Sequence, residues 1–81
     1  MRFNVYVTLK RGVLDPQGRA VMEALHSLHF SEVRDVRVGK FIELDLNGMP
    51  EEEAKARVEK MCQELLANPV IEEFRIEEVT E

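Results

Sequence analysis

The chain has one cysteine, three prolines, four glycines and few aromatic residues among its 81 positions. The lone Cys62 excludes a disulfide within the chain, which fits a reducing compartment. No apolar run approaches the roughly 20 residues that span a bilayer, and the N-terminus enters a strand pattern without the apolar core of a signal peptide. We therefore expect a cytoplasmic protein with no membrane association, folded as one domain over residues 1–81 with a marginal core.

Positive charge is also scarce. The net charge is −5, with seven Lys or Arg against four Asp or Glu in residues 1–40, and four against twelve in residues 41–81. This balance excludes a general nucleic-acid binder, and an RNA-binding sheet would have only Tyr6 and Phe41 for stacking. The basic residues of the first half are either ordinary solvated charge or a patch for an acidic partner protein. They are Lys10, Arg11, Arg19, Arg34, Arg37 and Lys40.

The first forty residues predict a strand followed by a helix. Residues 2–10 alternate in polarity, which is typical of a half-buried strand whose apolar face is Phe3, Val5, Val7 and Leu9. Asp15 is a favourable N-cap and Pro16 suits the first helical position, so a helix is expected over Pro16–Leu28. Its apolar positions are Ala20, Val21, Ala24, Leu25 and Leu28. Gly18 indicates either a close approach of another backbone or simple tolerance at a helix start.

Residues 33–46 allow two interpretations. A two-residue hairpin at Gly39-Lys40 would put Glu43 on the apolar face, because partners across a ladder point the same way. The apolar residues of the segment instead all stand at even-numbered positions. They share one face if the segment contains a longer loop or forms one continuous bent strand. They are Val36, Val38, Ile42, Leu44 and Leu46. A strand of this length would extend beyond a compact domain, so it would be shared across a homodimer.

The second half repeats the helix–strand order. Asn47-Gly48 ends the preceding strand, Pro50 begins a helix, and Asn68-Pro69 ends it. The apolar stripe of that helix is predicted to be Ala54, Val58, Met61 and Leu65, with Cys62 and Leu66 beside it. The last strand is expected over 72–79, with Phe74 and Ile76 inward. The fold class is therefore α+β: a small antiparallel sheet with two helices on one face, in the βαββαβ ferredoxin-like order.

Chemistry-bearing constellations are sparse. His26 and His29 lie three positions apart but lack a third ligand, so a metal site is not expected. Cys62 is interpreted as a packed thiol, and Gly39-Lys40 lacks the glycine and hydroxyl residues of a P-loop. The carboxylates of residues 51–53 complement a helix dipole. The residues themselves predict no catalytic centre.

Three stretches resemble one known family. VYVTLKRGVLDPQG (5–18) is similar to the start of PurS, the small subunit of phosphoribosylformylglycinamidine (FGAM) synthase. VRDVRVGKFIEL (33–44) and EEAKARVEKMCQELLANPVIEEFRIE (52–77) resemble its later motifs, so the match covers almost the whole chain. One departure is His29, where the family pattern has a glycine suited to the left-handed end of a helix.

The resemblance implies a non-catalytic subunit of an enzyme of purine biosynthesis. The complex converts formylglycinamide ribonucleotide to the amidine with ATP and glutamine. The resemblance further implies that a large synthetase subunit holds ATP and magnesium, that a glutaminase subunit releases ammonia, and that the PurS-like subunit joins the two as a homodimer or tetramer. No cofactor, metal or catalytic residue is expected in this chain itself.

The exposed residues of the matched motifs are the candidates for partner contact. They are Lys10, Arg11, Asp15, Gln17, Arg37 and Lys40. The same residues also fit ordinary surface positions, and Asp15 fits a helix cap. The principal alternative function is a stand-alone dimeric regulatory domain of the same architecture that binds a small molecule.

Overall fold

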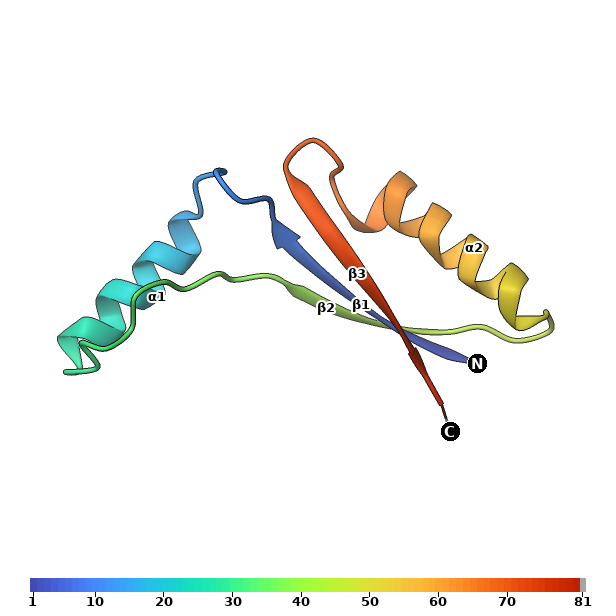
Figure 1. Ribbon diagram of the computed structural model, residues 1–81, viewed down its shortest axis with the longest axis horizontal. Coiled ribbons are helices and arrows are strands. Elements are labelled where there is room, and N and C mark those ends of the chain that lie inside the picture. Colours follow the sequence, from blue (N-terminus) through green and yellow to red (C-terminus); the bar gives the residue numbers. More distant parts are fainter. Residues whose placement is uncertain (81) are drawn as a thin grey trace.

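The computed structural model describes residues 1–80 and contains a three-stranded sheet with helical segments between the strands (Figure 1). The elements are β1 (Arg2–Leu9), α1 (Pro16–Ser27), β2 (Lys40–Asp45), α2 (Glu51–Met61), the π-helical turn η1 (Cys62–Leu66) and β3 (Glu72–Val79). The strand order is β2-β1-β3, and both pairings are antiparallel. The predicted α+β class is confirmed.

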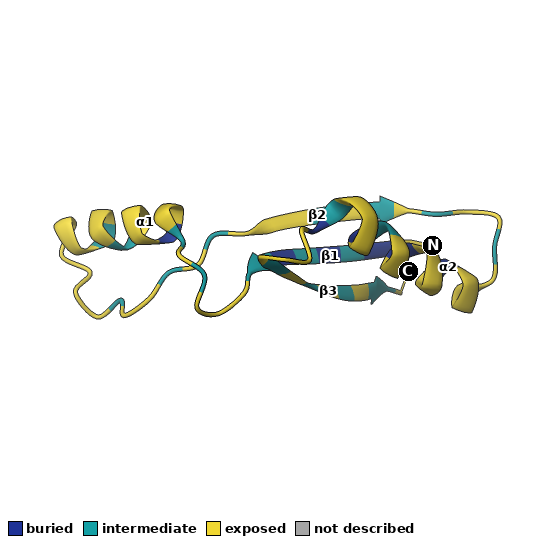
Figure 2. Cartoon of the chain, turned by 90° about the horizontal axis from the view of Figure 1, so that it is seen from above, coloured by how far each residue is buried: buried dark blue, intermediate teal, exposed yellow. Residues whose placement is uncertain are grey.

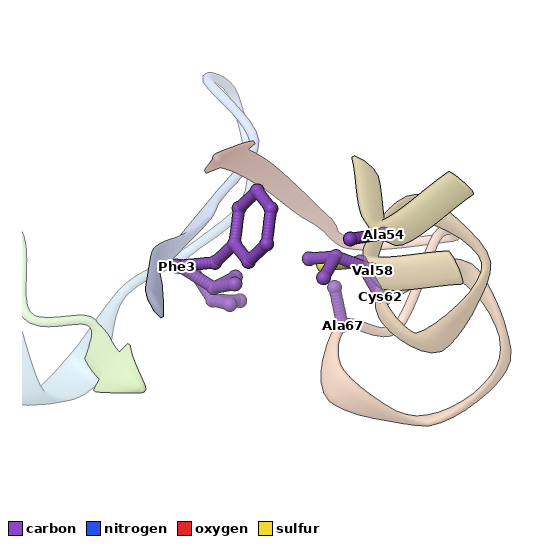
Figure 3. Close-up of a cluster of buried hydrophobic side chains, with 7 residues drawn as sticks. Phe3, Ala54, Val58, Cys62 and Ala67 are labelled. Atoms are coloured by element: carbon purple, nitrogen blue, oxygen red, sulfur yellow. The ribbon is translucent and has the colours of Figure 1, made fainter. Parts of the chain in front are cut away.

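The core lies between β1 and α2. Alternation along β1 turns Phe3, Val5 and Val7 to one face, where all three are buried. They meet Ala54, Val58, Cys62 and Ala67 from α2 and the residues after it (Figure 3). Each fully buried valine or phenylalanine contributes about 1.5–3 kcal/mol, so this small cluster carries most of the apolar stabilisation. Phe74 and Ile76 pack against it from β3, as predicted.

The end of the second helix differs from the prediction. Its buried residues are Ala54, Val58, Cys62 and Ala67, so the last step is five positions and not four. The amide of Ala67 donates to the carbonyl of Cys62 at 2.9 Å, which closes a widened π-helical turn. This turn rotates Leu65 away from the sheet and leaves it 82% exposed. The placement of Leu65 in the apolar stripe is therefore wrong.

Helix α1 does not lie on the sheet. Figures 1 and 2 show it beyond the ends of the strands, with the following segment returning beside it. We call residues 10–39 the arm, and the rest of the described chain the sheet unit. Gly18 is the one buried residue of the arm, and the predicted apolar face of α1 is exposed or half-buried. The expectation of two helices on one sheet face is thus corrected for the single chain: α2 covers the sheet, and the connections at 10–15 and 35–39 carry α1 away from it.

The middle segment forms no hairpin. Residues 33–39 run into β2 without reversing direction (Figure 1), and within residues 1–80 the partner of β2 is β1. The hairpin at Gly39-Lys40 is wrong, and the fourth strand of the βαββαβ order is absent from the described chain. A side chain at Gly39 would collide with the carbonyl oxygen of Val7, so glycine is required where the segment crosses the end of β1.

The arm makes the chain unusually long for its size. Its radius of gyration is 16.1 Å and its extents are 50 × 30 × 13 Å, whereas a compact chain of this length has a radius of gyration of about 12 Å. At the far end of the arm, His29 adopts the left-handed conformation with a φ of +75°. The amides of His29 and Phe30 donate to His26 and Leu25 at 3.0 and 2.9 Å, which closes a Schellman motif after Ser27.

Candidate functional site

The six predicted contact residues come together at the junction between sheet unit and arm. Lys10, Arg11, Asp15 and Arg37 line an open groove of about 730 Å³, bounded by the loop after β1, by α1 and by the returning segment. Asp15, Gln17 and Lys40 line a smaller hollow of about 180 Å³ beside the end of β1. Asp15 lies on both. The structure therefore gathers around one aspartate a set of residues that spans thirty positions of sequence.

Asp15 connects the two sides of the arm. One carboxylate oxygen accepts the amide of Gly18 at 2.9 Å, as the predicted N-cap requires. The other accepts the amide of Val38 at 3.1 Å, from the segment that leads into β2. These two hydrogen bonds, with a smaller contribution from the nearby Arg37 guanidinium, lower the pKa of Asp15 from its ordinary value. The carboxylate is thus engaged by the chain itself.

Gly18 fixes how closely α1 meets the returning segment. A side chain there would collide with the carbonyl oxygen of Val36 and with the Asp15 carboxylate. This close backbone approach is the first of the two roles that the sequence allowed for Gly18. With the Asp15 hydrogen bonds, it holds the start of α1 and residues 36–38 as one unit.

Three of the four cations at the junction have partners within the chain. The Lys10 ammonium donates to the carbonyl of Pro69 at 2.7 Å. Arg37 pairs with Glu73 at 3.7 Å, and Lys40 with Glu72 at 4.0 Å. The Arg11 and Gln17 side chains form no hydrogen bond or ion pair with any residue of the described part of the chain. Arg11 and Gln17 are therefore the two members of the set whose polar groups are fully available to another molecule.

Sequence reasoning missed the exposed apolar surface of the arm. Leu14 is 74% exposed, Leu28 is 65% exposed, and Val21 and Phe30 are also exposed. Val21 and Leu28 stand on the apolar face that the sequence predicts for the helix at 16–28, whereas Leu14 and Phe30 lie just outside that helix. The signal in the sequence is the spacing of the apolar residues at 36–46, which argues against a two-residue hairpin that would fold α1 back onto its own sheet.

The remaining candidates have structural explanations. The His26 ring donates from Nε2 to the Val33 carbonyl at 2.8 Å, so it ties α1 to the returning segment. Burial raises the pKa of the Cys62 thiol, with a smaller contribution from Glu59, in agreement with a packed thiol. Over residues 1–80, no three potential ligand side chains gather around a common point. In the same residues, no helix is both long and apolar enough to cross a membrane.

Comparison with known proteins identifies the family. The family model of PurS, described as phosphoribosylformylglycinamidine (FGAM) synthase, matches residues 2–80. The chain belongs to the PurS family. It is thus a subunit of FGAM synthase, an enzyme of purine biosynthesis. The resemblance carried by the three sequence motifs is confirmed.

The relatives cover nearly the full length of the chain. The Bacillus subtilis PurS subunit of phosphoribosylformylglycinamidine synthase is 50% identical over 76 residues, which are 94% of this chain and 89% of that protein. The Methanocaldococcus jannaschii PurS subunit is 46% identical over 72 residues, 89% of this chain and 87% of that protein.

Solved structures of the family share the fold. B. subtilis PurS superposes with a TM-score of 0.84 over 94% of each chain, at 50% identity. A chain of the Thermotoga maritima PurLQS structure superposes with a TM-score of 0.88 over 96% of this chain and 95% of that one, at 35% identity. That relative is part of an assembly of several subunits.

Proposed function

We propose that this chain is the non-catalytic coupling subunit of FGAM synthase, which joins the glutaminase and synthetase subunits and assists the transfer of ammonia between them. The reaction converts formylglycinamide ribonucleotide to the amidine with ATP and glutamine, and the large subunit binds ATP and magnesium. Ammonia that reaches bulk water is protonated and lost, so the two active sites must be docked and shielded from solvent. A subunit that serves this purpose needs surfaces for other chains and no active site of its own.

The observation that carries this proposal is the uncovered arm. Its helix exposes apolar side chains, and only glycine is buried within residues 10–39. An apolar helix face gains stability mainly through tertiary packing, so the arm requires a second chain to cover it. The T. maritima assembly supports this reading, because its PurS-like chain superposes along almost the whole length of the present chain.

The first chain to cover the arm is a second copy. The outer edge of β2 is unpaired within the described residues. Val36 and Val38 alternate in step with the apolar residues of β2, so the segment that contains them can pair with this edge as an additional strand. In such an exchange, residues 33–38 of one copy pair with β2 of the other, and α1 lies beside the α2 of the other. Each half then completes the βαββαβ order with a strand and a helix from its neighbour. The product is a homodimer with arms exchanged.

Charge supports the same exchange. Residues 10–39 contain Lys10, Arg11, Arg19, Arg34 and Arg37 against four acidic residues, whereas residues 41–81 carry four basic and twelve acidic ones. Laying the arm of one copy over the sheet unit of the other brings a weakly positive segment to a strongly negative one. Sedimentation of Val21→Asp tests this arrangement, because the substitution buries a charge only if the arm is covered. We expect wild type and the matched exposed control Ser27→Asp to be dimers and Val21→Asp to be a monomer; a dimeric Val21→Asp variant would contradict the exchange.

Reconstitution tests the coupling role. Amidine formation is measured with the large synthetase and the glutaminase, with glutamine or free ammonia as nitrogen source, and with or without this chain. We expect the chain to restore the glutamine-dependent reaction and to leave the ammonia-dependent reaction unchanged. If neither reaction responds and no complex forms, the coupling role is wrong.

Charge reversal at the junction tests the contact residues. Arg37→Glu and Lys40→Glu should weaken co-elution with the other subunits while the fold, followed by circular dichroism, is kept. Because Arg37 also pairs with Glu73 in this chain, the control is the double variant Arg37→Glu with Glu73→Arg, which restores that pair in reverse. Assembly that stays weak in the double variant places Arg37 at the interface, whereas full recovery would limit its role to the internal ion pair.

A further inference from the structure

The outer edge of β3 has no neighbouring strand. The sheet order is β2-β1-β3, so β3 pairs with β1 along one side, and its other side is unpaired within residues 1–80 (Figure 2). The proposed exchange of arms uses the edge of β2, on the opposite side of the sheet, so the edge of β3 stays open in the proposed dimer as well. An open edge strand offers its amide and carbonyl groups to an extended segment of another chain.

The strand register shows which backbone groups this edge offers. The Lys10 amide donates to the Ile71 carbonyl at 2.8 Å, immediately before the first pair of the ladder between β1 and β3. Hydrogen-bonded and non-hydrogen-bonded pairs alternate in an antiparallel ladder, so every second residue of β3 turns its amide and carbonyl away from β1. These residues are Glu72, Phe74, Ile76 and Glu78. The Glu72 amide is already bonded to the preceding turn at 2.7 Å, so the available edge is residues 74–78.

A hollow lies beside this edge, on the side of the sheet that α2 covers. It has a volume of about 370 Å³ and is lined by Phe3, Lys55, Glu59, Ile76 and Glu78. Phe3 and Ile76 supply apolar surface, and the other three side chains supply charge. Directly opposed residues of neighbouring strands point to the same face of a sheet. A residue of an added strand that lies opposite Ile76 therefore points toward the hollow.

The surroundings of the hollow are negatively charged. The Lys55 ammonium pairs with Glu51 at 3.4 Å and with Glu78 at 3.3 Å, so its charge is already matched. The Glu59 carboxylate forms no hydrogen bond or ion pair within the described part of the chain. Strand β3 itself carries four glutamates against one arginine. This charge is complementary to an extended segment that contains lysine or arginine.

The same charges oppose the pairing of β3 with a second copy of itself. The antiparallel register that places Phe74 opposite Ile76 also places Arg75 opposite Arg75, and Glu73 opposite Glu77. Like charges that lie directly opposite each other destabilise a strand pair. The edge is therefore better suited to a basic segment of a different chain than to a second copy.

We propose that the edge of β3 is a docking site for an extended, basic segment of another subunit of FGAM synthase, which adds a strand to the sheet. The added strand hydrogen-bonds to residues 74–78, one of its apolar side chains enters the hollow against Phe3 and Ile76, and a lysine or arginine pairs with Glu59. Main-chain hydrogen bonds supply affinity in this mode of recognition, and the side-chain hollow supplies specificity. The inference rests on the proposed association of this chain with the other subunits.

Binding of the full chain to the synthetase and to the glutaminase, each alone and both together, tests this site. Glu78→Pro removes one outward amide and blocks the edge, a position where an edge strand tolerates proline. The matched control Glu78→Ala removes the same side chain and keeps the amide. We expect Glu78→Pro to raise the Kd for the subunit that supplies the strand by at least about tenfold relative to Glu78→Ala. Circular dichroism and thermal denaturation check that both variants fold.

A charge reversal beside the hollow keeps the test decisive if Glu78→Pro misfolds. Glu59→Lys replaces attraction for the basic segment by repulsion, whereas the control Glu64→Lys makes the same charge change at an exposed residue of η1 outside the hollow. We expect the Kd to rise about tenfold for Glu59→Lys and to change little for Glu64→Lys.

Hydrogen exchange resolved to single amides detects the added strand directly. The outward amides of Phe74, Ile76 and Glu78 should exchange at least about tenfold more slowly in the complex than in the free chain. The amides of Arg75 and Glu77 point toward β1 and should change much less.

The outcomes separate this inference from the coupling role. A complex in which the outward amides gain no protection overturns the added strand and leaves the coupling role standing, and equal affinity of all variants does the same. Protection of these amides in the isolated chain that increases with its concentration assigns the edge to a second copy and rejects a partner subunit. If wild type binds neither subunit, the coupling role is wrong and this inference is rejected with it.

Discussion

The sheet unit and the arm are built from similar residues but differ in what stabilises them. In the sheet unit, alternating apolar residues of β1 are fully buried against α2 by the same chain. In the arm, a helix with an equally regular apolar face buries one glycine. Regular apolar spacing therefore shows that a face will be covered, but it does not show by which chain. The difference separates the part of the molecule that folds around itself from the part that serves assembly.

The largest effect in this comparison is expected from shortening a phenylalanine in each region. Phe3 is fully buried in the sheet unit, whereas Phe30 is 48% exposed in the arm. Phe3→Ala should lower the free energy of unfolding by about 3–5 kcal/mol through lost burial and an unfilled cavity. Phe30→Ala should lose less than half of that amount. Urea denaturation followed by circular dichroism measures both in the Val21→Asp variant, which is expected to be a monomer, and equal losses there would contradict the assignment of a separate, weakly packed arm.

The next effect concerns the contact that shapes the arm. Glycine to alanine within a helix normally stabilises by about 1 kcal/mol. At Gly18 the added methyl group would collide with the Val36 carbonyl, so Gly18→Ala should instead destabilise by about 1–3 kcal/mol, as overpacking does. The neighbouring exposed Gln17→Ala is the matched control and should be nearly neutral. A Gly18→Ala protein that is more stable than wild type in thermal denaturation would contradict this, because it would mean that the returning segment shifts at little cost to accommodate the methyl group.

A smaller gain is expected at the far end of the arm. His29 holds a φ of +75°, a conformation that costs a residue with a side chain about 1–2 kcal/mol. His29→Gly should therefore raise the free energy of unfolding by about 1 kcal/mol, measured by denaturation. His29→Ala separates this cause from simple loss of the imidazole, because alanine keeps the strain and should bring no gain.

The sequence predicts local structure well because its signals are local. The alternation of β1, the Asp15 cap, the break at Gly48 and the last strand all depend on residues within a few positions of one another, and the structure has each of them. The left-handed residue after α1 belongs to the same class. Family membership likewise follows from contiguous motifs that a comparison of sequences detects directly.

The features that the sequence did not predict depend on distant residues. The second carboxylate oxygen of Asp15 binds the amide of Val38, 23 positions away, and no local pattern marks that hydrogen bond. The widened turn at Cys62 depends on how the end of the helix packs on the sheet. The direction of α1 depends on whether residues 33–46 turn or continue. Their parity favours continuation, but parity alone does not distinguish a long loop from a strand that another copy completes.

The smallest expected effect is a dependence of the free energy of unfolding on pH that arises from Asp15. Its folded pKa lies below the ordinary 3.8, so the unfolded chain binds this proton more readily than the folded one. The contribution of Asp15 to stability is therefore fully present above about pH 5 and decreases as the pH falls from about 4 through the lower folded pKa. Asp15→Asn should be less stable than wild type at neutral pH, and the difference should shrink in acid.

Comparison of denaturation curves between pH 2.5 and 7 isolates this contribution as the difference between wild type and Asp15→Asn. Asp35→Asn is the matched control, because Asp35 is an exposed aspartate of the same arm that accepts no hydrogen bond within the described residues. We expect the Asp35 variant to follow the wild-type pH profile in parallel. Parallel profiles for the Asp15 variant would mean that its carboxylate caps the helix without holding residues 36–38. The arm would then be held by the close backbone contacts at Gly18 and Gly39 and by the hydrogen bond between His26 and Val33, and not by the Asp15 carboxylate.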